Sequence, residues 1–125
     1  MNWKVILGEI VEHATSVPSM EVFGIVFTDG HVLRCPNVPK DLAAGIKLIH
    51  ERVATLGFEN VEAVYTSHCH PNAAPTFKDF AQSIPGKRYI ICAPDDYIRT
   101  FRSARAIGSG HPYLVPESPP QRELQ

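Results

Sequence analysis

The spacing of apolar residues along the chain predicts two amphipathic helices. The first lies near the N-terminus, where apolar residues recur at helical spacing with charged residues between them, and Pro18 ends it. The second follows a proline-containing loop and stops at Gly57. The apolar faces are defined by Trp3, Ile6, Leu7, Ile10 and Ala14 in the first helix and by Leu42, Ile46, Ile49, Val53 and Leu56 in the second.

Runs rich in β-branched and aromatic residues predict strands around these helices. Residues 21–27, a turn at Asp29-Gly30 and a second strand at Val32-Leu33 form a predicted hairpin, with Glu21 at its entrance. Two further strands are expected at residues 61–66 and 88–93. Because strands alternate with helices, the pattern predicts an α/β fold, a curved mixed sheet with helices packed against it.

Two segments flank the predicted strand at residues 88–93. Before it, Thr76 occupies an N-cap position for a short helix that runs to about Ser83. After it, the spacing of Tyr97, Ile98 and Phe101 predicts a last helix that places an arginine row on a solvated face rather than in an anion-binding patch. That row is Arg99, Arg102 and Arg105. We expect one domain over residues 1–115, with residues 116–125 as a C-terminal tail or linker stub.

The composition narrows the class of protein. A chain of 125 residues, 44% of them hydrophobic, can bury the core of a single domain. Lys and Arg number 12 against 13 Asp and Glu, so neither nucleic acid nor a membrane is an expected partner. No apolar run approaches the roughly 20 residues of a membrane span, no signal peptide is evident, and the three cysteines form no Cys-x-x-Cys pair. These features predict a cytoplasmic protein in a reducing compartment.

One segment carries residues suited to catalytic chemistry. His68 and His70 stand two residues apart at the end of a predicted strand, so their side chains point the same way, and Asp79 follows on the next helix. Two imidazoles and a carboxylate can hold Zn²⁺ with a fourth position open for water, the pattern of a catalytic zinc. The pair of histidines alone has a plainer interpretation, because exposed or hydrogen-bonded histidines are commoner than metal ligands.

The arrangement resembles the JAMM (MPN-type, Mov34-like) zinc metalloproteases. Their motif is a strand glutamate followed far downstream by His-x-His-Pro and then Ser-x-x-Asp. The matching residues here are Glu21, the segment His68 to Pro71, and Thr76 with Asp79. The resemblance implies that His68, His70 and Asp79 are zinc ligands, that Glu21 carries the proton between water and leaving amine, and that Thr76 donates to the oxyanion.

The sequence also departs from the family pattern. Thr76 stands at the serine position, and Cys69 takes the middle place of the His-x-His, where we expect a small buried thiol that points away from the metal. The loop from Cys35 to Pro39, which reads Cys-Pro-Asn-Val-Pro, is similar to the Pro-x-Asn segment of siphophage tail-assembly proteins. This resemblance implies a role in phage tail assembly and a place in the virion tail.

Several alternatives stay open at this stage. The chain can instead be a non-catalytic MPN-fold scaffold subunit of a phage tail tip. A zinc nucleobase deaminase is excluded, because the chain has neither His-x-Glu nor Pro-Cys-x-x-Cys. If the protein is a hydrolase, a ubiquitin-like conjugate, a phage tail polypeptide and a peptidoglycan stem peptide fit equally well as substrates, and the sequence does not fix the oligomeric state.

Overall fold

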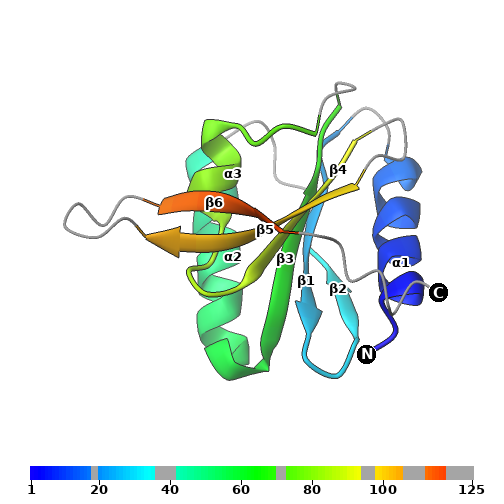
Figure 1. The fold of residues 1–125 in the computed structure, drawn as a ribbon, viewed down its shortest axis with the longest axis horizontal. Coiled ribbons are helices and arrows are strands. Elements are labelled where there is room, and N and C mark those ends of the chain that lie inside the picture. The colour runs from blue at the N-terminus through cyan, green and yellow to red at the C-terminus, as the bar shows by residue number, and fades with distance from the viewer. Residues whose placement is uncertain (18–19, 36–41, 70–72, 94–97, 106–111, 118–125) are drawn as a thin grey trace.

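The computed structural model describes residues 1–17, 20–35, 42–69, 73–93, 98–105 and 112–117 of the chain. The fold is α/β, as the sequence predicts, with a single mixed sheet of strand order β2-β1-β3-β4-β5-β6. Helix α1 covers one face of the sheet and helices α2 and α3 cover the other (Figure 1). The elements are α1 (Trp3–Ser16), β1 (Phe23–Phe27), β2 (Val32–Arg34), α2 (Leu42–Leu56), a 3-10 turn (Phe58–Asn60), β3 (Val61–Ser67), α3 (Phe77–Gln82), β4 (Arg88–Cys92), β5 (Ile98–Arg105) and β6 (Pro112–Glu117).

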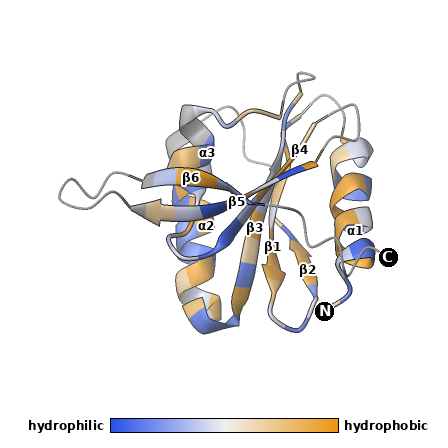
Figure 2. Ribbon diagram, in the orientation of Figure 1, coloured by the Kyte–Doolittle hydropathy of each residue, from blue (hydrophilic) through white to orange (hydrophobic). Residues whose placement is uncertain are grey.

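Each face of the sheet has its own hydrophobic core. The helices pack an apolar stripe on the sheet and leave polar residues outside, and hydrophobic and hydrophilic residues stand side by side along α1 in Figure 2. On the α1 face the core includes Trp3, Ile6, Ile10, Val22, Val26, Tyr65 and Ile90. On the α2 face it includes Phe23, Ile25, Ile49, Val53, Val64, Tyr89, Ile91 and Phe101.

Only one pair of neighbouring strands among the described residues is parallel. Strands β3 and β4 run in the same direction, with Ala63 opposite Arg88 and Ser67 opposite Cys92, while β1 lies antiparallel on the other side of β3. The C-terminal ends of β3 and β4 therefore meet the N-terminal end of β1 at one edge of the sheet. In open α/β sheets, ligands bind outside the carboxyl ends of the strands.

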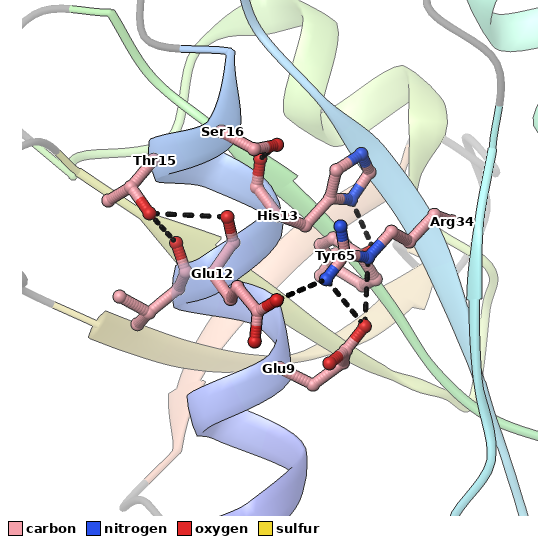
Figure 3. A network of polar contacts seen from close by, with 8 residues as sticks. Glu9, Glu12, His13, Thr15, Ser16, Arg34 and Tyr65 are labelled. Atoms are coloured by element: carbon pink, nitrogen blue, oxygen red, sulfur yellow. Dashed lines mark hydrogen bonds and ion pairs between the residues drawn. The ribbon is translucent and has the colours of Figure 1, made fainter.

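A polar network fixes α1 to the sheet (Figure 3). The buried His13 of α1 and Tyr65 of β3 form a hydrogen bond of 2.6 Å between Nδ1 and Oη. Burial and then the Arg34 charge lower the pKa of His13, which favours the neutral imidazole in this hydrogen bond with Tyr65. Arg34 of β2 pairs with Glu9 of α1 at 2.8 Å and with Glu12 at 3.5 Å.

The predicted last helix is wrong. Residues 98–105 form strand β5, in which Arg102 lies opposite Arg88 and Arg99 lies opposite Ile91. Successive side chains of a strand point to opposite faces, so Arg99 and Arg102 do not share a solvated face. Arg102 instead donates to Glu117 of β6 at 3.0 Å, and the side chain of Arg105 lies outside the described part of the structure.

Strand β6 is an element that the sequence analysis did not predict. It ends at Glu117, so the sheet includes the first two residues of the segment expected as a tail, and residues 118–125 lie outside the described residues. None of the described helices is long and apolar enough to cross a membrane.

Candidate metal centre

The site is built at the edge where β3 and β4 end. His68 directly follows β3, and its backbone N–H donates to the carbonyl of Cys92 at 2.9 Å, which continues the parallel pairing past the last strand residue. The side chain of His68 is 1% exposed. A histidine this well buried needs a polar partner.

Asp79 of helix α3 supplies that partner. Its Oδ2 lies 3.0 Å from His68 Nε2, and the Asp79 side chain is fully buried. Oδ2 also accepts from the backbone N–H of Thr76 at 2.8 Å and from the Thr76 hydroxyl at 3.1 Å. Thr76 is the N-cap of α3 and Asp79 its third residue, so the carboxylate reaches back to the N-cap as in a capping box. The sequence-predicted N-cap is thus confirmed, and both of its donors engage Asp79.

The Asp79 carboxylate is held in its charged form. Burial alone would raise the pKa of Asp79, but hydrogen bonds from His68, Thr76 and Tyr89 outweigh burial and lower the pKa below its usual range. The result is a buried anion whose negative charge faces His68.

Glu21 reaches the same edge through the pairing of β1 with β3. Gly24 lies opposite Tyr65 and Phe23 opposite Thr66. The backbone contact continues to Val22, which accepts from the Ser67 N–H at 2.9 Å. Glu21 directly precedes Val22 in the chain and therefore lies at the same end of the sheet as His68, which directly follows Ser67. The half-buried Glu21 also contributes its charge to Tyr89, whose pKa is raised by burial first, then by Asp79, and to a smaller extent by Glu21.

The sequence analysis missed two polar residues of the site, Tyr89 and Gln82. The Tyr89 hydroxyl donates to Asp79 Oδ1 at 2.9 Å and to Gln82 Oε1 at 3.2 Å. Tyr89 is 0% and Gln82 2% exposed. The available signal was a tyrosine next to two isoleucines in a predicted strand, because a buried phenol requires a hydrogen-bond partner.

Two sequence expectations concern the residues after His68. His70 lies outside the described residues, so its position relative to His68 and Asp79 stays a prediction. Cys69 is exposed, and the expectation of a buried thiol is wrong. The direction of the Cys69 thiol relative to the proposed metal stays a prediction.

The spacing of the donor atoms fits zinc. Two ligands at about 2.0 to 2.2 Å from a tetrahedral zinc lie about 3.3 Å from each other. The 3.0 Å between His68 Nε2 and Asp79 Oδ2 is within a few tenths of an ångström of that separation. Within the described residues, from which His70 is missing, no group of three His, Cys, Asp or Glu side chains forms a metal site. The same 3.0 Å is the length of the hydrogen bond that joins the two side chains in the structure, so zinc binding by this pair stays a prediction.

Comparison with known proteins adds little to this geometry. No family model matches the chain, and no curated protein matches it significantly. Among solved structures, a Salinibacter ruber protein whose solution structure was determined by the Northeast Structural Genomics Consortium is 22% identical. The match covers 92% of this chain and 90% of that chain, with a TM-score of 0.45. A likeness this distant carries no functional argument, so function is argued from the site.

Proposed function

We propose that the protein is a zinc-dependent metallopeptidase or isopeptidase similar to the JAMM enzymes. The observation that carries the proposal is the buried pair of His68 and Asp79 at the carboxyl ends of two parallel strands, with Glu21 brought to the same edge by the adjacent antiparallel strand. His70, two residues after His68, is the third proposed ligand.

Each residue of the site has a separate role in the proposed reaction. His68, His70 and Asp79 would hold Zn²⁺, which when bound supplies Lewis acidity that lowers the pKa of a water ligand toward about 7 and polarises an amide carbonyl. Glu21, which is not a ligand, takes the proton of the attacking water and returns it to the leaving amine. Thr76 donates to the Asp79 carboxylate through its backbone N–H and its hydroxyl. When substrate is bound, we propose that the hydroxyl turns its single proton from Asp79 to the oxyanion, while the backbone N–H keeps its hydrogen bond to Asp79.

The proposed substrate is an amide bond in a protein or peptide. A role in phage tail assembly rests on the resemblance of the loop after β2 to siphophage proteins, and residues 36–39 of that loop lie outside the described structure. Either a tail polypeptide or a ubiquitin-like conjugate is compatible with such a hydrolase.

Elemental analysis of the purified protein tests the metal site. We expect about one zinc per chain in the wild type and a loss of zinc in His68→Ala, His70→Ala and Asp79→Asn. The matched control is His31→Ala, which removes an exposed histidine at the end of the β1-β2 hairpin and should leave zinc content unchanged.

Two results would count against the proposal. Wild-type zinc content in both His68→Ala and His70→Ala would rule out the assigned ligands. Stoichiometric zinc without cleavage of any member of a broad peptide and isopeptide panel would instead favour the non-catalytic scaffold.

A further inference from the structure

The two oxygens of the Asp79 carboxylate have different hydrogen-bond partners. Oδ2 faces His68 Nε2, whereas Oδ1 accepts a hydrogen bond from the Tyr89 hydroxyl at 2.9 Å. An unrestrained carboxylate can rotate, or can bind a metal through both oxygens. A donor fixed on Oδ1 restricts the carboxylate to one orientation, with Oδ2 directed at His68.

Tyr89 is well placed to impose that orientation. It lies on β4 opposite Val64 of the parallel strand β3, belongs to the core on the α2 face, and has no exposed surface. Its ring is locked by packing, so its hydroxyl has one direction available. The position comes from a strand and not from a loop, and strand positions are the more precise ones.

Gln82 and α2 support the phenol from the other side. The Gln82 carbonyl Oε1 is the second acceptor of the Tyr89 proton, at 3.2 Å. On the α2 side, a Cβ built on Gly45 would lie 3.4 Å from Gln82 Nε2, so α2 packs close to this amide. The buried polar cluster runs from Gln82 of α3 through Tyr89 of β4 to Asp79, the proposed ligand.

We infer that Tyr89 is a positioning residue of the metal centre, which holds Asp79 Oδ1 so that zinc is bound through Oδ2 alone. This inference rests on the proposed zinc function. Groups outside the ligand shell that orient a ligand typically change metal affinity by about 10 to 100-fold when they are removed.

The test is the zinc affinity of Tyr89→Phe, measured by competition with a chromophoric chelator on metal-free protein. This variant keeps the ring and removes only the hydroxyl, and we expect zinc binding to weaken by about 10 to 100-fold. The matched control is Tyr65→Phe. Tyr65 is likewise 0% exposed and its hydroxyl likewise meets a buried side chain, His13, but on the opposite face of the sheet. We expect Tyr65→Phe to lose folding stability and to keep wild-type zinc affinity.

Zinc has no d–d spectrum, so Co²⁺ is used in its place to report the coordination of the metal. If Tyr89 had a purely structural role, its replacement would not change the visible spectrum of the bound Co²⁺. In Tyr89→Phe the freed Oδ1 can also coordinate, so the visible spectrum of the Co²⁺-loaded variant should weaken and shift relative to the wild type. Tyr65→Phe should give the wild-type spectrum.

A second variant keeps the inference testable if Tyr89→Phe does not fold. Gln82→Leu removes the other acceptor, so the Tyr89 proton is donated wholly to Asp79. Zinc affinity should then equal or exceed that of the wild type, and a tenfold loss would overturn the inference. Unchanged zinc affinity in a folded Tyr89→Phe would also overturn it while leaving the proposed function intact. A wild-type protein that binds no zinc removes both.

Discussion

The structure predicts that Gly24→Ala destabilises the protein, although replacing a glycine inside a strand by alanine ordinarily stabilises the folded state. Gly24 lies in the middle of β1, directly opposite Tyr65 of β3. The Tyr65 ring folds over the glycine, and a Cβ built at Gly24 would overlap the far end of that ring, including its hydroxyl. The ring cannot move away at little cost, because it is fully buried and bonded to His13.

The expected magnitude follows from three terms. Overpacking a core costs about 1 to 3 kcal/mol. Displacing the Tyr65 hydroxyl removes the hydrogen bond between Tyr65 and the buried His13, which costs about a further 1 to 3 kcal/mol. The reduced entropy of the unfolded chain returns about 0.4 to 1 kcal/mol. The net loss in the free energy of unfolding is therefore about 1 to 6 kcal/mol, a large part of the roughly 5 to 15 kcal/mol of a typical domain.

Equilibrium unfolding in urea, followed by far-ultraviolet circular dichroism in the presence of a chelator, measures this loss. Gly8→Ala is the control, since Gly8 is an exposed residue inside α1 with nothing within 4 Å of its added Cβ. It should gain about 1 kcal/mol. In a Tyr65→Val background, Gly24→Ala should cost under about 1 kcal/mol because the overlapping ring atoms are gone. A Gly24→Ala protein as stable as the wild type, or the same cost in both backgrounds, would refute the reasoning.

Three further predictions concern charge and reactivity. Glu21→Gln should retain zinc and fold but lose hydrolysis, since it removes the proton carrier without removing a ligand, and near-normal turnover by this variant would show that Glu21 is not the base. Burial opposes ionisation of Glu117, but its hydrogen bonds to two arginines, the first on β5 and the second on β4, outweigh burial and lower its pKa. The stability that Glu117 contributes is thus present above its unfolded pKa of about 4.3 and is lost as the pH falls through its lower folded pKa. Glu117→Gln should therefore destabilise the protein at pH 7 and have little effect near pH 2. Urea titrations at the two pH values measure this difference. A thiol reagent applied to the native protein should modify the exposed Cys69 quickly and the buried Cys35 slowly, because burial raises the pKa of Cys35 to about 11, and peptide mapping distinguishes the two.

The elements predicted from local patterns agree with the structure. Apolar periodicity identified α1 and α2, and Gly57, with φ of 90°, follows the last residue of α2 as expected. The strands β1 to β4 were equally visible from composition. The failures lie in β5 and β6, where the strand state depends on pairing with a neighbour distant in sequence. A three-residue spacing of arginines resembled a helix in β5, and two prolines argued against a strand in β6.

The candidate site divides in a similar way. The residues at fixed spacing, His68, Thr76 and Asp79, could be selected from sequence because adjacent elements bring them together. The hydrogen bonds of Tyr89 to Asp79 and to Gln82 depend on which faces of α3 and β4 meet, and no local sequence pattern indicates this. The prediction of a buried Cys69 failed for a related reason, because alternation along a strand predicts the direction of a side chain but not which groups cover it.

The two prolines of β6 also determine how the sheet ends. A free sheet edge is a template on which another chain can add a strand, and the hazard grows with the length of the edge. Here one edge is the three-residue β2, and the other is β6, in which Pro112 and Pro116 lack the N–H that a ladder requires. Within the described residues, neither edge strand offers a long uninterrupted row of backbone N–H donors, a feature that disfavours the addition of a strand from another chain.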